Sequence, residues 1–134
     1  MPKRNPSIAA VQDFRAWLSY AEEDLTSARI LVKEKIFRAA TYHTQQCAEK
    51  SLKSYLVFKQ QEIRKTHDLV ELTQLCAELD FEFVTLLDFA KNIKPYATRG
   101  RYPDDFLPPE EHDVIEVLNQ AANMLIFVQK KLNF

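Results

Sequence analysis

Apolar side chains recur along most of the chain at steps of three and four residues, the spacing that places them on one face of an α-helix. Five stretches show this pattern, and turn-forming or polar residues separate them. The sequence therefore predicts five amphipathic helices, at about Ile8–Lys35, Arg38–Lys59, Asp68–Leu79, Phe81–Lys94 and from Pro108 or Pro109 to the last residues.

Local signals support several of these boundaries. Pro6 suits the first position of a helix, and Asp68 with Glu71 three residues later resembles a capping box. Only Asp80 separates the third stretch from the fourth, so we expect these two helices to be nearly continuous. Pro95 is expected to end the fourth helix and to open an irregular segment that reaches Pro109.

These elements predict an all-α fold: an antiparallel up-and-down bundle of about five helices in a single domain over residues 1–134. The first, second and last helices are expected to form the long frame, with the other two shorter and packed on one side. In the last helix the apolar positions from Val114 to Leu132 alternate steps of four and three residues, which suits packing in the bundle or in a dimer.

Composition narrows the possible functions. The chain contains one glycine, Gly100, which disfavours both an all-β fold and a glycine-rich phosphate loop. A formal net charge of −1 argues against a long nucleic-acid track, so any such contact must rest on a local basic patch. Cys47 and Cys76 are expected to be buried and reduced, and no ligand spacing indicates a metal or another cofactor.

Membrane and export signals are not evident in the sequence. No apolar run approaches the roughly 20 residues that a membrane-spanning helix needs. The basic residues near the start are not followed by the apolar region of a signal peptide. We therefore expect a cytoplasmic protein without membrane association.

Four segments together carry a resemblance to a known family. The second helix reads YHTQQCAEKSLKSYL over Tyr42–Leu56, the connector reads KTHDL over Lys65–Leu69, and the late segment reads RYPD over Arg101–Asp104. The first helix carries Trp17, Ala21, Asp24, Leu25 and Ala28. From about Phe14 to Leu132 the chain resembles the HEPN domain family (higher eukaryotes and prokaryotes nucleotide-binding).

The resemblance implies a helical bundle that is commonly a homodimer. Family members are often encoded beside a minimal nucleotidyltransferase, with which they form a two-component, toxin–antitoxin-like pair. Many are metal-independent ribonucleases that use an Arg, four to six intervening residues and then a His, near the start of the last helix. This chain departs from that spacing, because His112 follows Arg101 by eleven residues.

One group of candidate site residues lies on the second helix. His43, Gln46, Lys50 and Lys53 fall within an arc of roughly 80° that borders the apolar face. Asp24 borders the apolar face of the first helix in the same way, so the two polar borders could meet in a cleft that binds a ligand. The alternative is that these are ordinary boundary residues, with Glu49 and Lys53 as an i,i+4 ion pair.

Other candidates lie in the connectors. His67, like His43, is a weak candidate for acid–base catalysis, and the alternative is that His67 and Asp68 only begin the third helix. On the late segment, Arg99 and Arg101 suit a phosphate and Tyr102 suits a nucleobase, with Asp104 beside them. The alternative is a connector in which Arg101 pairs with Asp104 or Asp105.

Three functions follow from these observations. The preferred one is a nucleotide- or RNA-binding module that works with a nucleotidyltransferase partner. The second is an endoribonuclease toxin, which would need His43 or His67 because the Arg-to-His spacing of the family is missing. The third is a structural dimerisation module without a ligand.

Overall fold

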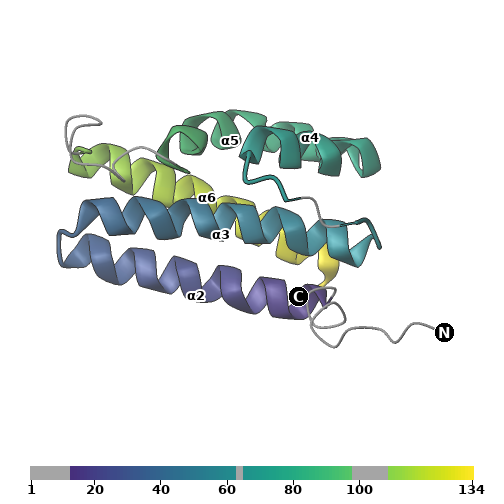
Figure 1. Cartoon of the computed structure of the whole chain (residues 1–134), viewed down its shortest axis with the longest axis horizontal. Coiled ribbons are helices and arrows are strands. Elements are labelled where there is room, and N and C mark those ends of the chain that lie inside the picture. Colours follow the sequence, from purple (N-terminus) through teal and green to yellow (C-terminus); the bar gives the residue numbers. More distant parts are fainter. Residues whose placement is uncertain (1–12, 63–64, 98–108) are drawn as a thin grey trace.

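The computed structural model describes residues 13–62, 65–97 and 109–134. These residues form five α-helices and two short 3₁₀-helices and contain no strand, which confirms the all-α prediction. The elements, labelled as in Figure 1, are α2 (Phe14–Lys33), α3 (Phe37–Phe58), α4 (Leu69–Leu79), η1 (Phe81–Leu86), α5 (Leu87–Ile93), η2 (Lys94–Ala97) and α6 (Glu111–Leu132). None of these described helices combines the length and the apolar character that crossing a membrane requires.

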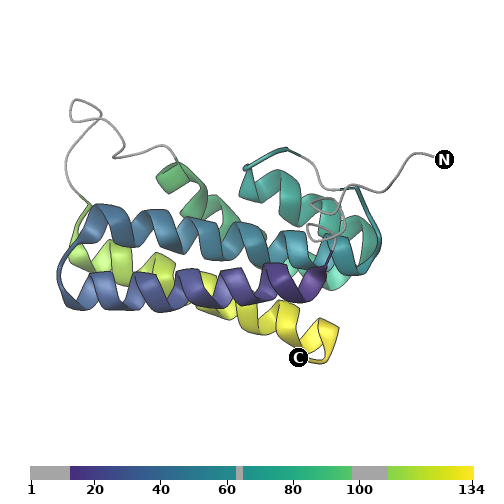
Figure 2. The ribbon, with the colours of Figure 1, turned by 60° about the horizontal axis from the view of Figure 1, so that its bottom comes forward.

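Three long helices, α2, α3 and α6, run along the length of the molecule, and the shorter α4 and α5 lie on the side away from α2 (Figure 1). The turned view in Figure 2 keeps α4 and α5 together on that side. Helix α3 is central, because it contacts α2, α4, α5 and α6. Its residues Ser51–Val57 are consecutively buried, so this stretch of α3 has no solvent-facing side.

One hydrophobic core joins all five α-helices. Phe83 of η1 is completely buried, and its ring lies 4.4 Å from that of Tyr55 and 4.9 Å from that of Phe127, measured between centroids. Cys47 and Cys76 are free and buried, as expected. Burial raises the pKa of the Cys47 thiol to about 12 and also raises the pKa of Cys76, which keeps both thiols protonated and unreactive.

Aspartate side chains begin three of the helices. Asp13 accepts a hydrogen bond from the amide of Arg15 at 2.9 Å, and Asp80 accepts one from the amide of Glu82 at 3.0 Å. Asp68 accepts from Val70 at 2.9 Å and from Glu71 at 3.3 Å, so it caps α4 as the sequence predicted. Such a cap typically stabilises a helix by about 1 kcal/mol.

Three features of the predicted helices need correction. The third and fourth predicted helices are not continuous, because the backbone of Asp80 is extended (φ −150°, ψ 105°) and α4 folds back against α5 there. The stretch predicted as one helix from Phe81 to Lys94 is divided into η1, α5 and η2. At the other end, Asp13 is also extended, so the first described helix begins at Phe14, and Ile8 lies outside the described residues.

Helices α2 and α3 are each followed by a left-handed residue that is not glycine. After α2 and α3 the chain adopts the left-handed conformation at Lys35 and Gln60, each with φ 59°. The next amide then bonds back into the helix, from Gln61 to the carbonyl of Leu56 at 2.8 Å in the case of α3. This Schellman geometry normally uses glycine, because a Cβ in the left-handed region costs about 1 kcal/mol or more.

Replacing Gln60 with glycine should therefore stabilise the protein by about 1 kcal/mol, because Gln60→Gly removes that Cβ and keeps the backbone amide that bonds to Val57. Urea unfolding of wild type and variant measures the difference. Gln60→Ala is the control, because it keeps the Cβ and should not gain this stability. Equal effects of the two substitutions would refute the strain at Gln60.

Candidate functional site

Two carboxylates are buried in the region where α2 and the connector before α4 meet α3. Asp24 of α2 is 7% exposed and Glu49 of α3 is 4% exposed. A buried carboxylate is unfavourable unless cations and hydrogen-bond donors surround it. Each of these two gathers its own set of polar side chains, and these sets contain the helix residues that the sequence predicted.

Asp24 binds two side chains of α3. Its Oδ1 lies 2.8 Å from Nδ1 of His43, and its Oδ2 accepts a hydrogen bond from Nζ of Lys50 at 2.6 Å. His43 and Lys50 are seven residues apart, two helical turns, so they lie on the same face of α3. The polar borders of the first two helices therefore do meet, as the sequence analysis suggested.

The contact with Asp24 determines which ring nitrogen of His43 carries the hydrogen. An ionised carboxylate is only an acceptor, so Nδ1 of His43 must donate in the 2.8 Å contact. The remaining polar atom of the ring, Nε2, is then available for other partners, and the His43 side chain is partly exposed. An imidazole held in this way can accept or donate a proton at Nε2.

Glu49 forms a second network, in which Glu49 and Lys53 are buried and the His67 side chain is exposed. Its Oε2 accepts a hydrogen bond from Nζ of Lys53 at 2.9 Å and lies 2.8 Å from Nδ1 of His67, while Oε1 accepts one from Gln45 at 3.0 Å. Gln46 in turn donates to Gln45 at 2.9 Å. The Glu49–Lys53 ion pair, which the alternative of ordinary boundary residues included, is thus present, and it is internal, because the Lys53 side chain is only 7% exposed.

Burial and hydrogen bonding shift the pKa of Glu49 in opposite directions. Burial by itself would raise the pKa of its carboxyl group, but the hydrogen bonds from Lys53 and His67 more than offset this, and the pKa is lowered. His67 also ties the connector to α3 through its backbone, because its carbonyl accepts from Gln45 at 3.4 Å. Lys53, Gln46 and His67 therefore all belong to a network that holds α3 to the start of α4.

An open pocket of about 250 Å³ adjoins the Asp24 cluster and is lined by Tyr20, Glu23, Asp24 and Lys50. Tyr20 is 57% exposed, and Nζ of Lys50 lies 5.8 Å from the centre of its ring. The sequence analysis missed Tyr20 and Glu23. Tyr20 lies four residues before Asp24 and Glu23 lies one residue before it, on the same helix. This closeness to Asp24 was the signal in the sequence that could have identified them. A second pocket, of about 200 Å³ between α3 and α4, is lined mainly by apolar and acidic side chains.

The late-segment candidates Arg99, Arg101, Tyr102 and Asp104 lie outside the described residues. The described chain stops at Ala97 before them and resumes at Pro109. A 3.2 Å ion pair between Lys35 and Glu111 places the first turn of α6 beside the α2–α3 turn. His43 follows the start of α3 by six residues, so it lies in the same end of the bundle.

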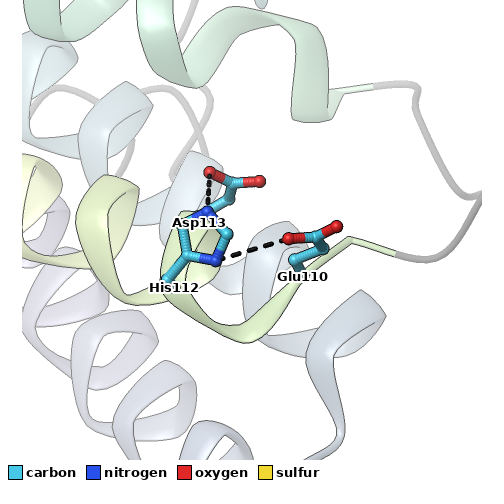
Figure 3. A group of neighbouring side chains, drawn as sticks. All are labelled: Glu110, His112 and Asp113. Atoms are coloured by element: carbon cyan, nitrogen blue, oxygen red, sulfur yellow. Dashed lines mark ion pairs between the residues drawn. The ribbon is translucent and has the colours of Figure 1, made fainter.

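At the start of α6, Glu110, His112 and Asp113 lie close together (Figure 3). Glu110 is 3.4 Å from Nδ1 of His112, and Asp113 is 3.2 Å from Nε2, so the carboxylates flank opposite nitrogens of one exposed ring. One ligand atom from each of the three side chains lies within 4.8 Å of the other two, so the group could hold a metal ion, although exposed acidic groups of this kind are common without one. The group has the geometry of surface ion pairs near a helix N-terminus, where acidic groups are favourable.

Removing the charge of Glu49 should destabilise the protein strongly at neutral pH. Glu49→Gln leaves the buried Lys53 without its anionic partner, and breaking such a pair costs about 3 kcal/mol or more. Because the folded-state pKa of Glu49 is lowered from 4.5, its contribution is complete above pH 4.5 and is lost as the pH falls through the folded-state value. The free energies of unfolding of wild type and variant should therefore converge at acid pH.

Urea unfolding between pH 3 and 7 measures this convergence. Glu78→Gln is the matched control, because Glu78 is exposed on α4 and its loss of charge should change stability by under ~0.5 kcal/mol. A Glu49→Gln variant as stable as wild type at pH 7, or a stability gap that persists unchanged into acid, would refute the buried ion pair.

Comparisons with known proteins agree with this architecture. "Putative toxin MJ1304" of Methanocaldococcus jannaschii is 26% identical, over 83% of this chain and 82% of that protein. The crystal structure of TT1696 from Thermus thermophilus matches with a TM-score of 0.78 and 26% identity, over 90% of this chain and 98% of that one. ST0689, described as an archaeal HEPN homologue, matches with a TM-score of 0.71 and 29% identity, over 88% and 96%.

The family assignment comes from the sequence model of the HEPN domain, which matches residues 14–131. This match includes all five described α-helices except the last residue of α6. It agrees with the resemblance carried by α3 and the connector that follows it. The chain therefore belongs to the HEPN domain family.

Proposed function

We propose that this chain is the HEPN component of a two-component, toxin–antitoxin-like system and that it binds a nucleotide or RNA. Membership of the HEPN family supports the first part, together with the similarity to a M. jannaschii protein whose name designates a toxin candidate. In this proposal the protein forms a homodimer and works with a nucleotidyltransferase partner, as the family resemblance implies.

One observation carries the binding function: Asp24, His43 and Lys50 converge from two helices beside an open pocket with an exposed aromatic ring. Burying Asp24 is unfavourable, and a hydrophobic residue at this position of α2 would pack without that cost. Clusters of charged groups at the mouth of a pocket are typical of functional sites. The cluster therefore favours a ligand site over a purely structural helix border.

The two lysines of α3 take different roles in this proposal. Lys53 is enclosed and paired with Glu49, so it maintains the fold. Lys50 is partly exposed, and its ammonium group has three hydrogens, of which one donates to Asp24. Lys50 can therefore also donate to a ligand in the pocket.

The main phosphate contacts are assigned to Arg99 and Arg101. Internal carboxylates already balance the charges of Lys50 and Lys53, which weakens their attraction for a phosphate. Arginine binds phosphate oxygens in pairs and is well suited to this role. After the late segment the described chain resumes just before α6, which starts beside the α2–α3 turn at the end of the bundle that holds His43.

The protein should bind a short single-stranded RNA of mixed sequence with an affinity that falls as salt rises, because phosphate contacts release counterions. The double variant Arg99→Ala/Arg101→Ala should weaken binding and reduce the slope of log K against log salt by about two, one for each lost contact. Isothermal titration calorimetry at several salt concentrations measures both quantities.

Lys59→Ala/Lys130→Ala is the matched control, because it removes the same charge from exposed positions near the other ends of α3 and α6. It should leave the affinity close to that of wild type. Equal affinities of wild type and the arginine variant would remove the late segment from the site. No binding of RNA or of any mononucleotide by wild type would contradict the binding function and favour a structural dimerisation module.

A further inference from the structure

The pocket between Tyr20, Glu23, Asp24 and Lys50 has a polarity that does not suit a phosphate. Two carboxylates and one ammonium line it, so its side chains carry a net negative charge at neutral pH when His43 is not counted. A phosphate would be repelled there. A ligand group that enters this pocket must instead present hydrogen-bond donors to the carboxylates and a flat surface to the aromatic ring.

Tyr20 provides that surface. More than half of the residue is exposed, although its neighbours Leu18 and Ala21 in α2 are buried, and its ring borders the pocket. Nucleobases stack on exposed aromatic side chains irrespective of their sequence, so Tyr20 alone would hold any base. Nζ of Lys50 lies over this ring, 5.8 Å from its centre, so discrimination between bases must come from Lys50 and the other polar groups that line the pocket.

The polar groups that line the pocket differ in how many hydrogen bonds they can still form with a ligand. Both oxygens of Asp24 are occupied, one by His43 and the other by Lys50. The carboxylate of Glu23 is exposed and has no hydrogen bond or ion pair with any residue that the structure describes. The pocket thus presents a cationic donor, Lys50, which Asp24 holds in position, and a carboxylate acceptor, Glu23, with both of its oxygens available.

We propose, building on the nucleotide-binding function above, that this pocket selects guanine. The Watson–Crick edge of guanine presents one acceptor, O6, followed by two donors, N1–H and the 2-amino group. Lys50 can donate to O6 while the two oxygens of Glu23 accept from the two neighbouring donors. Adenine, cytosine and uracil each lack the adjacent pair of donors, and so leave part of the carboxylate facing an acceptor or a carbon.

Titration with GMP, IMP and AMP, monitored by isothermal titration calorimetry, tests this selection. IMP is GMP without the 2-amino group, so it isolates one of the two hydrogen bonds to Glu23. GMP should bind about tenfold more tightly than AMP, the discrimination that a bidentate contact to a base typically gives, with IMP in between. Glu23→Gln should lose this preference, because an amide cannot accept two hydrogen bonds in parallel from guanine.

Two control variants separate recognition from folding. Glu116→Gln removes an equivalent exposed charge from α6 and should keep the preference for GMP. Tyr20→Ala should weaken the binding of all three nucleotides in proportion, and Tyr20→Phe, which keeps the ring, should restore most of that binding. Binding by Tyr20→Phe as weak as that by Tyr20→Ala would contradict the stacking role.

Two short RNAs, UUGUU and UUAUU, distinguish a free nucleotide from a base within a strand. A preference for GMP over AMP identifies a mononucleotide site, and a preference shown only between the two RNAs identifies a guanine within RNA. Binding of all ligands with equal affinity would overturn the guanine assignment and leave the nucleotide-binding function intact. No binding of any nucleotide or RNA would overturn both.

Discussion

The charge of Glu49 is the constraint on which the arrangement of this molecule depends. Glu49 is buried on helix α3, which contacts four other helices, so its carboxylate requires a paired cation and hydrogen-bond donors. Lys53 supplies one from the next turn of the same helix, and His67 supplies the other contact from the connector before α4. The contact between Glu49 and His67 therefore also determines where the connector meets α3. It thereby sets the position at which Asp68 begins α4.

Asp24 is also a buried carboxylate that needs cations and hydrogen-bond donors, but its surroundings differ from those of Glu49. It too is buried and holds two side chains of α3, but it lies at the border of α2 and α3 beside an open pocket. Its partners His43 and Lys50 are therefore partly exposed, whereas the lysine that pairs with Glu49 is enclosed. The same chemistry thus holds the connector before α4 to α3 at Glu49, where His67 is also exposed, and places polar groups beside an open pocket at Asp24.

The sequence predicted the helices better than their junctions. Apolar periodicity is strong along α2, α3 and α6, so these helices and the contact of Asp24 with the polar border of α3 could be anticipated. The position of the break at Asp80 was anticipated, but its extended backbone and the division of the following stretch into η1, α5 and η2 were not, because apolar periodicity continues across these junctions. Tyr20 and Glu23 were missed because exposed residues carry no periodic signal, and their role depends on how α2 is aligned with Lys50.

The central claim is that the polar face between α2 and α3 is a nucleotide site and not only a helix border. An NMR titration of ¹⁵N-labelled protein with GMP tests it most directly, because backbone amide shifts report where the ligand lies. If GMP binds there, the largest shifts will cluster around Tyr20 and Glu23 in α2 and around Lys50 in α3. Shifts centred on His112 at the start of α6, or no shifts at millimolar GMP, would contradict it.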